Sequence, residues 1–491
     1  MDMKRSLGVC AVWIATILTT DAQTNEFKKA YEEFRRQAIK EYTDFRDKAN
    51  KEYADFMRRA WEQYQALPEI PKPKDELPVP PVTFPEEDKD EPVKDTPKPY
   101  EEVVPVVEPE PQPKPVEPIR EQPQPDEETF TFDFFQTTCK VRLGDKHRFA
   151  LASCDMNVLA NAWERLAGSE YNNVIRDCLE LRIRHRLCDW AYLLMLQELS
   201  DAYFGKGTNE STLLCAYLYC QSGYQMRLGL GNGRLYLLVA SQHQIYECAY
   251  WDIEGMFYYP FNCQEESLEI CGASFPNEQP LSLLVSDIPL LAEQSSDSRM
   301  LQSERYQDIK VQVASDKNLI SFFDTYPSSM IGENFCTRWA FYANTPMSER
   351  IKKQLYPSLR NAIQGCSQQE AANKLLNFVQ TAFVYEYDDK VWGGDRAFFA
   401  EENLYYPYCD CEDRSILFSR LVRDLLGLKV LLVYYPGHLA TAVCFTDSVS
   451  GDYILFNKRK YVVCDPTYIG APVGATMPDM DNGSATVILL E

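Results

Sequence analysis

Three residues near the C-terminus have the types and the spacing of a thiol-dependent catalytic site. Cys411, His438 and Asp465 follow one another at intervals of 27 and 27 residues. A thiol nucleophile needs a base that accepts its proton, and the base needs an acceptor that orients it. We therefore expect Cys411 to act as nucleophile, His438 as general base and acid, and Asp465 as the residue that orients His438.

The helix that must position Cys411 is indicated by the residues that follow it. Apolar residues between Ile416 and Leu426 recur with the spacing of a helix buried along one side, and Gly427 ends this pattern. Cys411 is therefore expected in or beside the first turn, where free backbone N–H groups and the positive end of the helix dipole stabilise a thiolate. This position predicts a lowered pKa for the Cys411 thiol and makes it a candidate nucleophile.

The strands expected after this helix place the other two residues. His438 follows a Pro-Gly pair and opens an apolar strand, from which its imidazole can face the start of the neighbouring helix. Asp465 ends a later apolar strand and is followed by proline, so it can accept a hydrogen bond from the imidazole. The other histidines, His147, His185 and His243, lie in basic or polar, turn-like surroundings and are not expected to take part.

Three short motifs carry a resemblance to a known family. Asp410-Cys411-Glu412-Asp413, Pro436-Gly437-His438 and Asp465-Pro466-Thr467 together resemble the transglutaminase-like superfamily of papain-type thiol enzymes. The first motif is particularly similar to the bacterial transglutaminase-like cysteine proteinase branch. The similarity covers residues 368–468. It implies a papain-like α+β core with the cysteine as nucleophile, the histidine as base and acid, and the aspartate as its orienting partner.

The resemblance also implies a side-chain donor that joins the backbone N–H of the cysteine in an oxyanion hole. Trp392, Tyr405 and Tyr406 are the upstream candidates, and no motif selects among them. The chain differs from the family in having a second cysteine, Cys409, two residues before the first. Two thiols are therefore open to consideration, and the position at the helix start favours Cys411.

The N-terminal part is expected to contain a signal peptide and a long helix. Residues 1–22 combine a basic start, a short apolar run and small polar residues, which predicts a secretory signal peptide cleaved near Ala22. Residues 25–67 lack Pro and Gly and repeat Tyr, Phe and Ala every 11 residues, which predicts one helix with a nearly straight aromatic stripe. The stripe fits self-association as a coiled coil, docking on a partner helix, contact with the catalytic body, or a simple spacer.

The next segment changes abruptly in composition. Residues 68–128 contain 18 of the chain's 30 prolines among many acidic residues, which predicts an extended acidic linker, most simply a passive spacer. An α+β unit is expected over residues 129–300. It contains a helix expected from about Glu210 to Ser222, which is ended by Gly223 and precedes several strands, as the Cys411 helix does. This unit is either a degenerate, catalytically silent copy with Asn209 in place of the nucleophile, or an unrelated α+β unit.

Composition excludes several classes of protein. A net charge of −23 argues against nucleic-acid binding, which needs a surplus of lysine and arginine. The apolar run of residues 7–18 is too short for a transmembrane span, and no other segment has about 18 consecutive apolar residues. The cysteines lack zinc spacing, so neither a metal nor another cofactor is expected. Without Cys10, fifteen of the sixteen cysteines remain, and this odd number would leave one thiol over after pairing. The mature protein is expected in a periplasm, at a cell envelope or outside the cell.

The expected catalytic domain covers residues 301–491, and its expected substrate is a protein or peptide. Cys411 would attack an amide carbonyl and form a thioester, which water resolves in a peptidase or amidase. The resemblance favours this hydrolysis. The alternatives are transglutaminase-type transfer to an amine, and a non-catalytic envelope binding or scaffold protein that retains the fold.

Overall fold

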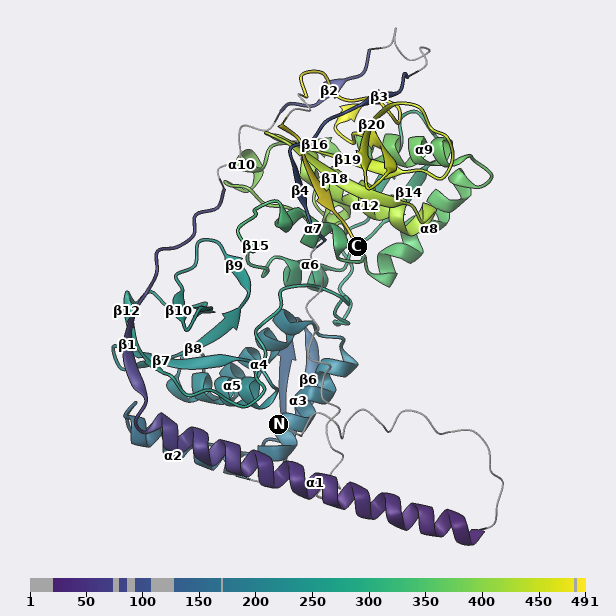
Figure 1. Cartoon of the computed structure of the whole chain (residues 1–491). Helices are drawn as coiled ribbons and strands as arrows, with labels where there is room; N and C mark the ends of the chain where they lie inside the picture. Colours follow the sequence, from purple (N-terminus) through teal and green to yellow (C-terminus); the bar gives the residue numbers. More distant parts are fainter. Residues whose placement is uncertain (1–20, 74–78, 86–92, 107–127, 169–170, 481–483) are drawn as a thin grey trace. The chain divides into compact units, whose positions relative to one another are not determined.

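The computed structural model describes residues 21–73, 79–85, 93–106, 128–168, 171–480 and 484–491 (Figure 1). The chain divides into two compact units, Met1–Tyr53 and Ala54–Glu491, and each is considered by itself. The second unit is of mixed α+β structure. The expected signal peptide falls almost wholly on residues outside the described part. Within that part, no helix has both the length and the apolar character to cross a membrane.

The long N-terminal helix ends earlier than the sequence predicts. Helix α1 spans Asp21–Met57, whereas Trp61–Gln65 forms strand β1, which pairs antiparallel with β12 (Ser267–Cys271). The prediction of helix up to residue 67 is therefore wrong. Its backbone groups gain partners on β12, and this long-range pairing outweighs the local helix preference. The indole N–H of Trp61 also donates to the carbonyl of Met57, which satisfies one of the free groups at the helix end.

The aromatic repeat leaves a row of exposed rings on α1. The side chains of Phe34, Phe45 and Phe56 are 68%, 47% and 43% exposed. Because they are separated by eleven residues, close to three helical turns, they lie along one side of the helix. This row remains available to a partner helix or to a second copy, and association through it stays a prediction.

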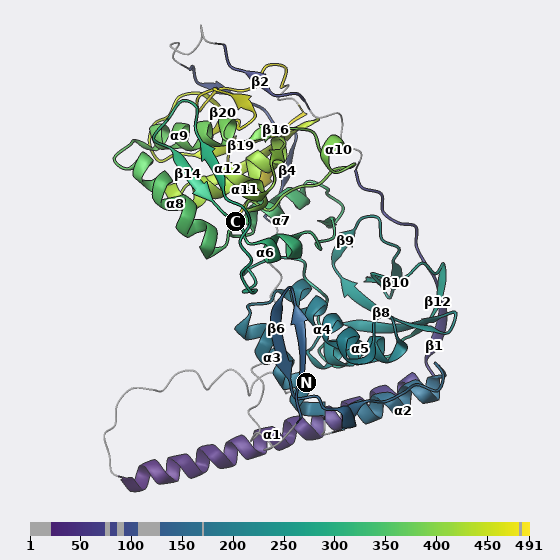
Figure 2. The same cartoon turned by 180° about the vertical axis from the view of Figure 1, so that it is seen from behind.

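Residues 129–300 form the first α+β part of the second unit (Figure 2). Its elements are β5 (Phe130–Phe134), β6 (Thr137–Val141), α2 (Met156–Leu166), α3 (Asn172–Arg184), α4 (Asp189–Phe204), α5 (Asn209–Gln221), β7 (Met226–Gly231), β8 (Arg234–Ser241), β9 (His243–Ile245), β10 (Trp251–Ile253), β11 (Met256–Tyr259) and β12. The main sheet has the strand order β1-β12-β7-β8-β11-β10, with antiparallel neighbours. Helix α5 packs on β8, and α4 packs on α5.

Residues 301–491 form the second α+β part, joined to the first by β13 (Arg299–Gln302). The elements that follow are β14 (Lys310–Val313), α6 (Lys317–Phe323), β15 (Ser329–Ile331), α7 (Thr337–Asn344), α8 (Glu349–Ile363), α9 (Gln368–Thr381), β16 (Val384–Tyr385), α10 (Asp388–Val391), α11 (Glu402–Tyr405), β17 (Tyr408–Cys409), α12 (Cys411–Leu426), β18 (Lys429–Tyr435), β19 (His438–Cys444), β20 (Asp452–Phe456), β21 (Arg459–Cys464), β22 (Tyr468–Ile469) and β23 (Thr486–Leu489). Helix α12 packs across β18 and β19, and α7 and α9 pack against α12 (Figures 1 and 2).

The described parts of the proline-rich segment belong to this second fold. Strands β2 (Val82–Thr83), β3 (Thr96–Pro97) and β4 (Glu102–Val104) pair in parallel with β22, β20 and β23. The seven-stranded sheet therefore has the order β3-β20-β21-β19-β18-β23-β4. The prediction of a passive spacer over residues 68–128 is wrong for these parts. The edge strands of the sheet have unpaired backbone groups, and the segment supplies partners for them.

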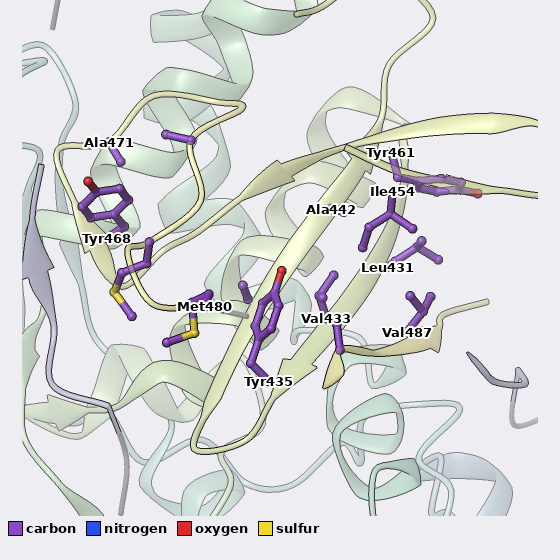
Figure 3. Close-up of a cluster of buried hydrophobic side chains, with 14 residues drawn as sticks. Leu431, Val433, Tyr435, Ala442, Ile454, Tyr461, Tyr468, Ala471, Met480 and Val487 are labelled. Carbon is purple, nitrogen blue, oxygen red and sulfur yellow. The ribbon is translucent and has the colours of Figure 1, made fainter. Parts of the chain in front are cut away.

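Apolar side chains of the same segment join the core of the sheet. The core includes Val433 from β18, Ala442 from β19 and Val487 from β23, which lie close together in Figure 3. Val82 and Val103 pack against this cluster. Burial of such side chains stabilises the fold by about 1.5–3 kcal/mol each when it is complete, and by less here because both are partly buried.

Candidate active site

The start of α12 is built as the sequence predicts. Cys411 is the first residue of the helix, and Asp410 is its N-cap. The carboxylate of Asp410 accepts hydrogen bonds from the backbone N–H groups of Glu412 (3.1 Å) and Asp413 (3.4 Å). Asp413 in turn accepts from the N–H of Asp410 at 3.2 Å, which completes a capping box. Gly427 ends the helix in the left-handed conformation, at φ 66°.

His438 and Asp465 form the second half of the expected constellation. His438 opens β19, and its Nε2 lies 2.8 Å from Oδ2 of Asp465, which follows β21. The other carboxylate oxygen of Asp465 accepts the N–H groups of Thr467 (2.8 Å) and Tyr468 (3.2 Å), so the carboxylate is held in place. Nδ1 of His438 is buried and has no hydrogen-bond partner among the described residues. The histidine is thus oriented through one nitrogen and available through the other.

Cys411 and His438 line one cavity of about 970 Å³. A hydrogen bond joins helix α12 to strand β19: the hydroxyl of Ser415 on α12 donates to the carbonyl of Leu439 on β19 at 2.8 Å. The first turn of the helix therefore faces the first residues of the strand. The structure therefore brings Cys411 and His438 to one cavity, with Asp465 bonded to His438.

The electrostatics around the thiol differ from the expectation. Burial raises the pKa of the Cys411 thiol well above its ordinary value, and the carboxylates of Asp410 and Glu412 raise it further. The N–H of Leu439 acts in the opposite direction but less strongly. The prediction of a lowered pKa from the helix start is therefore wrong for this structure. Desolvation and two adjacent negative charges outweigh the helix dipole, which leaves the resting thiol protonated.

The two neighbouring cysteines have different surroundings. Cys409 is buried and points its thiol toward the carbonyl of Val384, at 3.9 Å, rather than into the cavity. Burial raises the pKa of Cys409, with the nearby Arg414 guanidinium acting against it. Of the two thiols, Cys411 is the one on the cavity wall.

The three aromatic residues named for the oxyanion hole lie elsewhere. Trp392 and Tyr405 pack edge-on against the ring of Tyr406, whose hydroxyl donates to Asp324 at 2.8 Å. The guanidinium of Arg396 lies over the rings of Trp392 and Tyr406. None of the three lines the cavity. They form an aromatic cluster beside the partly exposed Arg396 guanidinium instead.

A fourth aromatic residue, which the sequence did not single out, lies close to the thiol. Tyr385 is in β16 and stands opposite Cys409 in the pairing with β17. Its hydroxyl is buried and has no hydrogen-bond partner among the described residues. Burial raises the pKa of Tyr385, and Cys411 and then Asp410 raise it further, which indicates that the hydroxyl is near both. Tyr385 is not among the residues that line the cavity, and its hydroxyl is free to donate a hydrogen bond. Strand β16 has only two residues, so no periodic pattern in the sequence predicts it.

Carboxylates also line the cavity. Asp388, Asp395 and Glu412 each place a carboxylate oxygen within 4.8 Å of the others. The backbone N–H of Arg396 donates to Asp388, and Arg338 forms an ion pair with Asp395. Oε1 of Glu412 is buried and has no hydrogen-bond partner in the described part of the chain. These residues have the chemistry to hold one cationic group beside Cys411, although the sequence predicts no metal or cofactor.

The first α+β part repeats the arrangement around Asn209. Asn209 is the first residue of α5, with Thr208 as N-cap, and its side chain accepts the N–H of Leu235 at 2.9 Å near the start of β8. Cys411, the first residue of α12, similarly lies near the N–H of Leu439, near the start of β19. Strand β8 lies between β7 and β11, as β19 lies between β18 and β21. This likeness favours the interpretation of residues 129–300 as a silent copy, which stays a proposal.

No family model, curated protein or solved structure matches the chain.

Proposed function

We propose that residues 301–491 form a thiol enzyme of the transglutaminase-like type that attacks amide bonds of peptides or proteins. The observation that carries this proposal is the hydrogen bond between His438 and Asp465, which leaves Nδ1 of His438 available at the cavity that Cys411 lines. A buried histidine with one nitrogen on a fixed carboxylate is equipped to accept a proton and return it.

The proposed reaction has two stages. His438 takes the proton of the Cys411 thiol as sulfur attacks the carbonyl carbon, and it then gives this proton to the departing amine, which leaves a thioester. In the second stage His438 takes a proton from water as the water oxygen attacks the thioester. The carboxylic acid departs and the proton returns to sulfur. The raised pKa of the Cys411 thiol makes the proton transfer to His438 a necessary part of the first stage.

Two donors are available for the negative charge on the carbonyl oxygen. The backbone N–H of Cys411 is in the first turn of α12, where backbone N–H groups lack partners within the helix. The hydroxyl of Tyr385 is a side-chain donor close enough to Cys411 for the thiol to raise its pKa, and it has no hydrogen-bond partner among the described residues. Loss of one such donor typically costs about 100-fold to 1000-fold in kcat.

The second candidate function is transfer of the acyl group to an amine, which shares the first stage. We favour hydrolysis because the Asp410-Cys411-Glu412-Asp413 motif is similar to the cysteine proteinase branch. A binding or scaffold protein without catalysis is the third candidate.

We also propose that the protein is exported, because residues 1–22 have the pattern of a signal peptide. The N-terminal sequence of the protein purified from its source would show whether residues before the predicted cleavage site are absent.

The deciding experiment compares the parent with Cys411→Ala and Cys409→Ala in a peptide library, with and without an added primary amine. Product masses separate hydrolysis from amine transfer. We expect hydrolysis by the parent, at least about 1000-fold less by Cys411→Ala, and activity within a few-fold of the parent for Cys409→Ala. Tyr385→Phe is expected to keep substrate affinity and lose rate. Equal hydrolysis by the parent and Cys411→Ala would refute the proposal.

A further inference from the structure

Carboxylates are numerous in the lining of the cavity beside Cys411. They are Glu247, Asp388, Asp389, Asp395, Asp410 and Glu412. Of the two lysines in the described lining, Lys72 lies 3.5 Å from Glu247, and Lys390 lies 2.8 Å from Glu386, which is outside the lining. Arg338 forms an ion pair with Asp395. The described lining therefore has six carboxylates and two lysines.

Glu412 is the buried carboxyl of this group that has an unsatisfied oxygen. The residue is only 5% exposed, and its Oε1 has no hydrogen-bond partner among the described residues. Burial, and then the neighbouring Asp410, raise the pKa of Glu412 well above its ordinary value, and a cation bound beside it would favour its charged form. Glu412 lines the cavity together with Asp388 and Asp395, and the three have oxygens within 4.8 Å of one another. A single cation can therefore contact all three.

The distance to the thiol restricts which cationic group of a substrate can bind there. Sγ of Cys411 and a carboxylate oxygen of Glu412 lie within 4.8 Å of each other. A carbonyl carbon ready for attack lies about 3–3.5 Å from the sulfur. The α-nitrogen of the same residue is two bonds away, roughly 2.5 Å from that carbon. A lysine side-chain ammonium on that residue extends several bonds farther. The α-ammonium of a first residue fits this spacing.

We infer that this carboxylate group binds the free α-ammonium of a peptide or amino-acid amide, so that the enzyme releases the N-terminal residue. The inference deepens the proposed function and depends on it. An amine acceptor fits the same place less well, because it must lose its proton to attack and carboxylates stabilise the protonated form. Binding would supply Glu412 with its missing partner and place the scissile carbonyl against Cys411.

The test uses one peptide library in two forms, with free N-termini and with N-acetylated termini, and the full-length protein. We expect release of the first residue from free peptides at a rate at least tenfold above cleavage of the acetylated ones. Equal cleavage of both forms would overturn the inference and leave the thiol hydrolase intact. No cleavage of either form would refute the hydrolase and the inference together.

Two matched variants locate the effect. Glu412→Gln is expected to lower kcat/KM for free peptides at least tenfold and to change it little for acetylated peptides. Glu349→Gln removes an exposed carboxylate of α8 that does not line the cavity and is expected to leave kcat/KM for both substrate forms within about twofold of the parent. Melting temperatures near that of the parent exclude unfolding as the cause. A loss that is equal for both substrate forms, or a rate that depends on an added divalent cation without preference for free N-termini, would overturn the inference.

Discussion

At the scale of single residues, the site combines a well-oriented base with a thiol that is hard to ionise. His438 is held by Asp465, whereas Cys411 is buried beside Asp410 and Glu412. A helix start usually lowers the pKa of a thiol. That effect is offset here because the carboxylates of Asp410 and Glu412 raise the pKa of Cys411. Removal of one negative charge, or arrival of a positive one, should therefore change the reactivity of the thiol more than any change in the helix itself.

The raised pKa of Cys411 predicts the pH dependence of its alkylation. The thiolate is the reactive form, so the rate with iodoacetamide should rise with pH through neutrality without a plateau by pH 9. Asp410→Asn retains an N-cap residue but removes a charge, which lowers the thiol pKa and should raise the rate at pH 7.5 about threefold to tenfold.

Peptide-level mass spectrometry separates Cys411 from the other free thiols in this measurement. Cys366, which is partly exposed and far along the chain from the site, serves as the internal reference in the same sample. A rate for Cys411 that is already constant between pH 6 and pH 9 would contradict the prediction. It would indicate an ion pair of thiolate and imidazolium in the resting enzyme.

At the scale of elements, α12 is positioned by polar contacts, and only some of them can be predicted from its own sequence. The capping box and the glycine end are local features, while the bond from Ser415 to Leu439 depends on the sheet. Another helix start, that of α8, depends on a distant carboxylate. Glu401 accepts the N–H of Ser348 at 2.7 Å and its hydroxyl at 2.8 Å, in a fully buried position.

Burial of Glu401 predicts how stability changes with pH. Burial raises the pKa of Glu401 from 4.5 to about 7, although its bonds from Ser348 act against this. The folded state therefore binds a proton that the unfolded state has released between these values, and stability falls as pH rises from about 4.5 to about 7. The contribution of this residue is on the order of 3 kcal/mol.

Glu401→Gln removes the charge and can keep both hydrogen bonds. We expect its free energy of unfolding to fall less than that of the parent between pH 5 and pH 8, as measured by urea unfolding. Glu349→Gln, at an exposed carboxylate of α8, should follow the parent curve. Parallel curves for all three proteins would show that Glu401 ionises normally in the folded state.

At the scale of the whole molecule, the proline-rich segment is part of the C-terminal fold. Strands β3 and β4 form the two outer edges of the seven-stranded sheet, and Val79 donates its N–H to the carbonyl of Gly437, next to His438. The segment also supplies Pro71 and Pro80 to the wall of the cavity that Cys411 and His438 line. It therefore contributes to stability and to the shape of the site.

Val104→Asp tests whether the segment is needed for folding. Val104 in β4 is 1% exposed and pairs with Ile488, so a charge there should lower the free energy of unfolding by at least about 3 kcal/mol. Lys94→Asp, at an exposed position of the same segment, should change it by less than about 0.5 kcal/mol. Thermal unfolding measures both. Unchanged stability of Val104→Asp would restore the spacer interpretation.

The sequence by itself determined the features that depend on neighbouring residues. The start and end of α12, the strands that carry His438 and precede Asp465, and the identity of Cys411 as the thiol at the helix start all follow from caps, glycines and apolar periodicity. These signals act within a few residues, so they do not require knowledge of the fold.

The tertiary structure alone decided the rest. Strand β1, the edge strands β3 and β4, the nearness of Tyr385 to Cys411 and the raised pKa of the thiol all depend on residues far away in the chain. Edge pairing is set by which backbone groups lack partners, and a pKa is set by burial and by the charges that packing brings close. Neither the pairing of edge strands nor the pKa of a buried group can be predicted from a local stretch of sequence, because both depend on contacts that exist only after folding.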